Sequence, residues 1–226
     1  MNWTLRIDPV MSFETWIIGR GKGWIALNKP PGVLVEDNPW ESDNLERMLH
    51  AYLSKTVKKP FVGIVHRLDR VTGGVVLMAT QKQALKELNA QFEQKTVRKS
   101  YRAIVAGLPD PPEATLKHWL EVDTRQKKAM IRPGRTERSK EAILHYCTLG
   151  HREGCTLLDI VIETGRFHQI RAQLAAIGHP VVGDLKYGSE ISLPDGSILL
   201  QAVELIFIDP HNGERVTLRL PDPLSF

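Results

Sequence analysis

Asp69 is the residue of this sequence best placed to do chemistry. It lies in the short polar segment His66–Arg70, between two apolar runs, and Thr72 follows it closely. Arg67 and Arg70 flank Asp69, and a nearby cation favours the ionised form of a carboxylate. An ionised aspartate on a loop at a strand end is able to act as a nucleophile or a general base. A structural ion pair would use the same residues, so local chemistry leaves both interpretations open.

Arg171 is the second ionisable residue in an unusual place. A helix is predicted from about residue 166 to 177, with Gly178 at its C-terminal end and Pro180 beyond. The apolar residues that define its buried face are Phe167, Ile170, Leu174 and Ile177. Arg171 falls on that same face, where a guanidinium is costly unless an acid pairs with it. We therefore expect Asp69 to be its partner, within about 6 Å.

The elements predicted around Asp69 are strands. Val62–Val65 and Val75–Ala79 are β-branched, almost wholly apolar runs, which is typical of central strands buried on both faces. Strands are also predicted at Thr15–Ile18, Trp24–Leu27, Tyr101–Ala106, Val203–Ile208 and Val216–Leu220, and a hairpin joins Ala142–Leu149 to Thr156–Glu163 through Gly150–Gly154.

Two further helices complete the predicted elements. One has Asp43 as its N-cap and Glu46 as the second residue of a capping box, and the other runs from about Gln81 to Gln94. Many strands, few helices and few regular βαβ units indicate an α+β fold with a mixed, mainly antiparallel sheet flanked by helices. No Pro- or Ser-rich linker divides the chain, so we expect one domain over residues 1–226.

Composition excludes several classes of protein. The chain has 226 residues, of which 42% are hydrophobic and 25% charged, as in ordinary globular proteins. No apolar run approaches the length of a membrane span, and the first ten residues do not form a signal peptide. Two cysteines exclude a disulfide framework, so a cytoplasmic location is expected. The spacing of His145, Cys147, His151 and Cys155 is not a standard zinc pattern, so no metal is expected.

Positive charge is concentrated in one segment, from Thr124 to Lys140. Seven basic residues and one acid give it +6, so the other 209 residues carry −2 of the total +4. These basic residues, the basic strip, are Arg125, Lys127, Lys128, Arg132, Arg135, Arg138 and Lys140. Pro133-Gly134 and weak apolar periodicity predict a loop or ribbon. The strip is either a solvated face or a surface that tracks RNA phosphates without base readout.

Four sequence blocks in order resemble the RluA-type RNA pseudouridine synthases. The first is Asn28–Gly32, and the second, Ile64–Leu77, contains His66-Arg67-Leu68-Asp69-Arg70. The third, Arg98–Gly107, resembles the family's motif around its active-site tyrosine. The fourth extends from Thr164-Gly165-Arg166-Phe167-His168-Gln169-Ile170-Arg171 to Tyr187-Gly188. Any one block alone is a weak signal, whereas four in order are specific.

The resemblance implies isomerisation of uridine to pseudouridine in structured RNA, rRNA or tRNA, after the base is flipped out. It assigns Asp69 as the nucleophile, Tyr101 as the ring stacked on the target base and Arg171 as the cation paired with the aspartate. Ile170 would line the uracil pocket, and Arg67 would help displace or replace the flipped nucleotide. No cofactor, metal, membrane or obligate protein partner is implied.

The chain departs from the family pattern after the aspartate. The family usually has Thr-Ser-Gly, where this chain has Thr72-Gly73-Gly74. Thr72 is expected in the substrate-binding set, and the lost hydroxyl at Gly73 makes the loop more permissive. The Asn28 block lies too close to the start for an N-terminal S4-type RNA-binding domain, so none is expected.

Two rival functions remain. One is a catalytically inactive RNA-binding protein of the same fold, against which the presence of Asp69, Tyr101 and Arg171 argues. The other is a hydrolase with Asp69 as its nucleophile. A hydrolase needs a positioned water and a second acid–base group, for which the sequence offers no clear residue.

Overall fold

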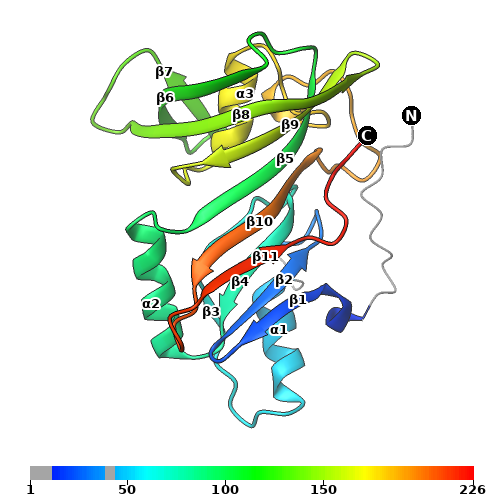
Figure 1. Cartoon of the computed structure of the whole chain (residues 1–226). Helices are drawn as coiled ribbons and strands as arrows, with labels where there is room; N and C mark the ends of the chain where they lie inside the picture. Colours follow the sequence, from blue (N-terminus) through cyan, green and yellow to red (C-terminus); the bar gives the residue numbers. More distant parts are fainter. Residues whose placement is uncertain (1–11, 39–43) are drawn as a thin grey trace. The chain divides into compact units, whose positions relative to one another are not determined.

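The computed structural model describes residues 12–38 and 44–226 (Figure 1). The chain divides into two compact units. Unit 1 comprises Met1–Arg98 and Ala202–Asp222, and unit 2 comprises Lys99–Gln201 and Pro223–Phe226. Asp69 belongs to unit 1, whereas the other two candidate catalytic residues belong to unit 2.

Unit 1 contains a sheet with the strand order β1-β2-β4-β10, to which β3 adds beside β4 and β11 beside β10. The strands are β1 (Ile17–Gly21), β2 (Trp24–Lys29), β3 (Gly63–Ile64), β4 (Gly73–Ala79), β10 (Leu200–Ile208) and β11 (Arg215–Arg219). The pairs β1/β2, β2/β4, β3/β4 and β10/β11 are antiparallel.

Strand β4 has the burial that its sequence predicts, because all seven of its residues are buried. The other run that was predicted to be a central strand does not have the expected burial. The run Val62–Val65 yields only the two-residue strand β3, whose Ile64 is half-buried, so the expectation of a second central strand was wrong. A short apolar run does not reveal whether a strand finds neighbours on both edges.

The helices of unit 1 are η1 (Phe13–Trp16), α1 (Leu45–Ser54) and α2 (Lys82–Glu93). The expected cap Asp43 lies outside the described residues, and the N-cap of α1 is Asn44, whose side chain accepts a hydrogen bond from the Arg47 amide. Leu88 of α2 joins the core formed by residues of β2, β4, β10 and β11, among them Trp24, Leu77 and Phe207.

Unit 2 contains the strand order β5-β9-β8-β6-β7, and each neighbouring pair is antiparallel. The strands are β5 (Arg98–Ala106), β6 (Glu113–Asp123), β7 (Lys128–Arg132), β8 (Lys140–Arg152) and β9 (Cys155–Ile162). The predicted hairpin is confirmed as β8/β9, but its turn is shorter than expected, since Gly150 lies within β8 at a register shift.

Helix α3 (Gln169–Ala176) packs on the β6–β7 part of unit 2, and η2 (Leu185–Tyr187) follows it (Figure 1). The helix begins three residues later than predicted because His168 adopts a left-handed conformation, with φ 51°. Phe167 therefore lies outside the helix and is 44% exposed, so its assignment to the buried face was wrong. Arg171 and Leu174 are buried, as predicted.

The predicted α+β class with a mainly antiparallel sheet is confirmed. The expectation of a single domain over residues 1–226 stays a prediction. None of the helices in the described ranges is long and apolar enough to cross a membrane.

Candidate functional site

Asp69 lies on the loop between β3 and β4, and one backbone and one side-chain hydrogen bond hold this loop to the turn that follows β2. The Gly32 amide donates to the Arg70 carbonyl at 2.7 Å, and Arg70 Nε donates back to the Gly32 carbonyl at 3.0 Å. Within the loop, the Thr72 amide donates to the Asp69 carbonyl at 3.0 Å. Hydrogen bonds thus connect the sequence blocks Asn28–Gly32 and Ile64–Leu77.

Lys29 is buried beneath the same loop, at the end of β2, with no exposed surface. Its Nζ donates to the carbonyl oxygens of Pro30 at 2.9 Å, Val33 at 2.8 Å and Arg70 at 3.2 Å. Burial lowers the pKa of Lys29 to about 7, the Asp69 carboxylate opposes that shift, and Arg70 adds to it. Lys29 therefore couples electrostatically to Asp69.

Sequence reasoning assigned no role to Lys29. The available signal was its position, since a lysine two residues after the apolar run Trp24–Leu27 and directly before Pro30-Pro31 has little room to reach solvent. A buried ammonium is costly unless acceptors surround it, and here three carbonyls do so.

Arg67 lies on the exposed side of the Asp69 loop. Its Nη1 contacts both carboxylate oxygens of Glu36 at 2.6 Å, and both side chains are at least half exposed. This ion pair joins the loop to the segment before α1. The predicted role of Arg67 in displacing the flipped nucleotide stays a prediction.

Gly73 and Gly74, which follow Asp69, differ in how much space a side chain would have. A Cβ on Gly74 would lie 2.2 Å from the Ala202 carbonyl oxygen, and the φ of Gly74 is +116°, so only glycine fits. A Cβ on Gly73 would lie 3.2 Å from Pro31 Cδ and 3.3 Å from the Lys29 oxygen, which is tight but not prohibitive. Thr72 is 2% exposed, and among the described residues its hydroxyl has no hydrogen-bond partner.

Tyr101 lies in β5 of unit 2, opposite Ile160 of β9, and is 8% exposed. Ile170, the second residue of α3, is 5% exposed. Both side chains are mostly withdrawn from solvent, which suits residues that would enclose a planar base. Their contacts with a base stay predictions.

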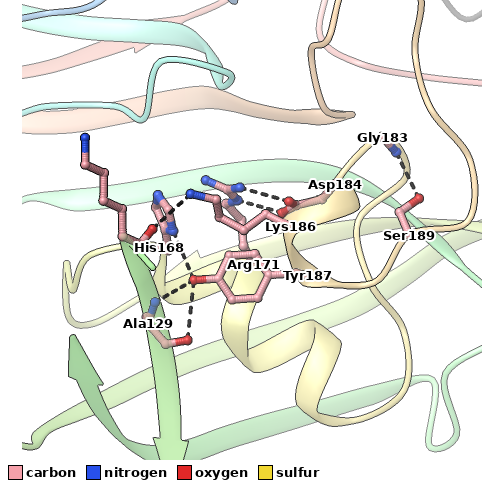
Figure 2. A network of polar contacts seen from close by, with 9 residues as sticks. Ala129, His168, Arg171, Gly183, Asp184, Lys186, Tyr187 and Ser189 are labelled. Atoms are coloured by element: carbon pink, nitrogen blue, oxygen red, sulfur yellow. Dashed lines mark hydrogen bonds and ion pairs between the residues drawn. The ribbon is translucent and has the colours of Figure 1, made fainter. Parts of the chain in front are cut away.

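Arg171 is buried in unit 2 and pairs with Asp184 (Figure 2). Arg171 Nε donates to Asp184 Oδ2 at 2.6 Å and its NH2 group donates to Oδ1 at 2.8 Å, a bidentate contact. The guanidinium carbon also lies 5.0 Å from the centre of the Tyr187 ring. The prediction that a buried Arg171 needs an acid is confirmed, with Asp184 as an acid that the sequence reasoning did not consider. Pairing of Arg171 with Asp69 stays a prediction.

Tyr187 connects Arg171 to the ribbon that carries the basic strip. Its hydroxyl accepts a hydrogen bond from the Ala129 amide of β7 at 2.7 Å and lies 3.0 Å from His168 Nδ1 (Figure 2). Lys128 Nζ lies 4.8 Å from the centre of the same ring. Lys186 Nζ donates to the Lys127 carbonyl at 3.1 Å, which fixes the β6–β7 turn to η2.

The basic strip forms the β6–β7 turn, β7 and the following turn, so the expected ribbon is confirmed. Six of its seven basic residues are exposed, and Lys128 is half-buried. Arg132 Nε pairs with the Glu121 carboxylate at 2.9 Å. The guanidinium carbon of Arg135 lies 5.9 Å from the centre of the Trp119 ring. An open hollow of about 500 Å³ is lined by Arg135, Thr136, Glu137 and Ser139.

The residues considered for zinc do not gather. His145 Nδ1 lies 2.7 Å from the Thr115 hydroxyl, and its Nε2 lies 2.6 Å from Glu163. His151 contacts Thr156, and both cysteines are free thiols. Within residues 12–38 and 44–226 no three His, Cys, Asp or Glu side chains form a metal-binding group.

Comparison with known proteins adds an independent observation. A family model described as RNA pseudouridylate synthase matches residues 23–176, a range that includes Asp69, Tyr101 and Arg171. An uncharacterized RNA pseudouridine synthase of Mycobacterium bovis is 38% identical over 165 residues, which cover 71% of this chain and 53% of that protein. This chain therefore spans about half the length of that relative.

Two further relatives are similar over nearly the whole chain. Ribosomal large subunit pseudouridine synthase C of Buchnera aphidicola is 30% identical over 97% of this chain and 71% of its own length. The solved structure of human RNA pseudouridylate synthase domain containing 1 superimposes with a TM-score of 0.76 at 25% identity, covering 96% of this chain and 87% of that one. By sequence and by fold, the chain belongs to the RluA-type family of RNA pseudouridine synthases.

Proposed function

We propose that the protein isomerises uridines of structured RNA to pseudouridine, with Asp69 as the nucleophile. The observation that carries this proposal is the match of the family model to residues 23–176, which includes the Asp69 loop. The geometry supports it, because Lys29, Gly32 and Arg70 hold that loop through backbone contacts on a buried scaffold. A nucleophile needs such positioning to attack one atom of a bound base or sugar.

The reaction is an exchange of bonds within one nucleotide. The glycosidic bond between ribose C1′ and uracil N1 breaks, the uracil turns, and a new bond joins C1′ to uracil C5. The proton on C5 is lost and N1 gains one, so no oxidant, reductant or cofactor is consumed. Asp69 attacks the sugar or the base in the first step and is released as the new bond forms.

The other candidate residues have supporting roles in this proposal. Tyr101 stacks on the flipped uracil and Ile170 lines its pocket, as their burial in unit 2 allows. Arg171 pairs with Asp69 to keep it ionised, Thr72 belongs to the substrate-binding set, and Arg67 helps displace the nucleotide.

The proposed substrate is ribosomal RNA of the large subunit, in the cytoplasm. The relative from Buchnera aphidicola carries that substrate in its name, as does ribosomal large subunit pseudouridine synthase D of Zymomonas mobilis, which is 33% identical over 85% of this chain. The basic strip supplies the positive surface that RNA phosphates need. Transfer RNA is the alternative substrate within the same proposal.

The test compares the protein with its Asp69→Asn variant on RNA transcribed in vitro, which contains no pseudouridine at the start. Large-subunit rRNA and a tRNA pool are incubated separately, and pseudouridine is mapped at nucleotide resolution. We expect the protein to modify rRNA, and the variant to bind the same RNA without modifying it.

The outcomes separate the rival functions. Binding of RNA by the wild-type protein without any pseudouridine would favour the inactive RNA-binding protein. Release of free uracil would instead identify a hydrolase with Asp69 as its nucleophile. Modification confined to tRNA would change the substrate but keep the reaction.

A further inference from the structure

Phe167 has an aromatic side chain that is exposed to solvent. It is 44% exposed, although the helical spacing of its neighbours predicts a buried position. Phe226, at 37%, is the other exposed aromatic residue among those the structure describes. A single exposed apolar side chain is common and needs no explanation by itself. The support beneath Phe167 is what distinguishes it.

The Phe167 ring lies flat on the ring of His168. Their centroids are 3.8 Å apart with an interplanar angle of 19°. His168 has a φ of 51°, a left-handed conformation that a residue other than glycine rarely adopts. This conformation delays the start of α3 and turns Phe167 away from the apolar face of the helix. The exposed ring therefore depends on a strained backbone at one residue.

His168 is in turn held from below by Tyr187. Its Nδ1 lies 3.0 Å from the Tyr187 hydroxyl, and the two rings meet edge to face at 5.6 Å. The Tyr187 hydroxyl also accepts a hydrogen bond from the Ala129 amide of β7 (Figure 2). Phe167 is thus stacked on His168, which contacts Tyr187 edge to face, and Phe167 is the exposed member of the three.

Cations lie beside Tyr187 and in the segment that leads to Phe167. Lys128 of the basic strip lies over the Tyr187 ring, Arg166 precedes Phe167 in the chain, and Lys99 Nζ lies 3.8 Å from a Cβ built on Gly165. A rigid, exposed aromatic face among cations suits a nucleobase, whose ring stacks while its phosphates meet the charges.

We infer that Phe167 is a stacking platform for an unpaired nucleobase of the RNA, in addition to the site of the flipped uridine. The inference rests on the proposed function, since RNA is its ligand. It adds an aromatic base contact to the phosphate contacts proposed for the basic strip, which contains no aromatic residue. Lys128 contacts the Tyr187 ring and Phe167 lies on His168, which also contacts Tyr187, so both features are built on the same residues of unit 2.

The experiment measures binding of two RNA probes to the full chain. One is a labelled oligouridylate of about 15 nucleotides, and the other is a blunt RNA duplex of the same length, whose bases are already stacked. The variant Phe167→Leu removes the aromatic face but keeps an apolar side chain. The variant Phe167→Trp keeps an aromatic face at the same position. Phe226→Leu makes the same change at the other exposed phenylalanine and is the matched control.

We expect Phe167→Leu to weaken binding of the oligouridylate about tenfold and to leave duplex binding unchanged. Phe167→Trp and Phe226→Leu should bind both probes like the wild-type protein. The dependence of affinity on salt should not change in Phe167→Leu, because no charge is removed. These differences cannot arise from a general loss of folding, which would weaken both probes together.

Equal affinity of Phe167→Leu and the wild-type protein for the oligouridylate would overturn the inference, and so would an equal loss for both probes. Failure of the wild-type protein to bind the oligouridylate would do the same. Pseudouridine formation by the wild-type protein is measured separately, so a failed platform is distinguishable from a failed assignment of the reaction.

Discussion

Arg171 and Asp184 form a bidentate ion pair inside unit 2, with 5% and 1% of their surfaces exposed. Arg171 comes from α3 and Asp184 from the loop before η2, so the pair fixes the end of that loop to the helix. The orientation of the residue expected to face Asp69 is therefore set by an acid thirteen positions further along the chain.

Replacing Asp184 with asparagine should destabilise the protein by about 3 kcal/mol, because a buried guanidinium loses its bidentate carboxylate. The free energy of unfolding in urea measures this loss. Glu190→Gln, at an exposed position near the same loop, is the control and should change stability by less than about 0.5 kcal/mol. Equal stability of Asp184→Asn and the wild-type protein would show that the pair contributes little.

Lys29 makes stability depend on pH in the alkaline range. Its pKa is about 7 in the folded protein and 10.5 ordinarily, so between these values the unfolded chain binds the extra proton. Stability should therefore rise with pH, by about 3 kcal/mol from about pH 7 to about pH 9.5.

The check is the difference in the free energy of unfolding between about pH 7 and about pH 9.5, in the wild-type protein and in Lys29→Met. Lys29→Met should lose most of the rise even if it is less stable at every pH. Lys58→Met, at an exposed lysine, should keep the rise. An unchanged rise in Lys29→Met would mean that Lys29 is not the group responsible.

The two glycines after Asp69 should respond differently to a side chain. Gly74→Ala should cost at least about 3 kcal/mol, since its Cβ meets the Ala202 backbone and its φ of +116° excludes a side chain. Gly73→Ser should cost less than about 1 kcal/mol, because Pro31 needs to yield by only a few tenths of an ångström. Thermal and urea unfolding of both variants test the contrast, which similar losses at the two positions would contradict.

The basic strip should contribute to RNA binding unequally along its length. Replacing both Arg135 and Arg138 with glutamine should weaken binding to rRNA and flatten the dependence of log Kd on log salt by about 1 to 2. Arg132→Gln should have a smaller effect, because Glu121 already pairs with Arg132 and raises its pKa. Affinities measured over a range of salt test this, and an unchanged slope in the double variant would make the strip a solvated face.

The pattern of apolar residues along the sequence predicted the features that depend on neighbouring residues in the chain. The apolar, β-branched run Val75–Ala79 became a strand with both faces buried, because β-branched residues favour strands and an apolar run without alternation leaves no face suited to solvent. The periodicity around Arg171 predicted its burial and its need for an acid, and both are present. The four sequence blocks, taken in order, predicted the family that the family model confirms.

Tertiary structure decided what depends on residues distant in the sequence. Val62–Val65 is as apolar as a central strand, yet only two of its residues pair, since pairing depends on neighbours that the run does not encode. Phe167 fits the helical spacing but is exposed, because His168 turns left-handed and bonds to Tyr187. Lys29 is polar and still buried, because three carbonyls converge on its ammonium from the turn after β2 and the Asp69 loop. Sequence alone thus determined which residues are chemically able to act, whereas the fold decided which partners hold them, because a hydrogen bond or ion pair depends on distance in space.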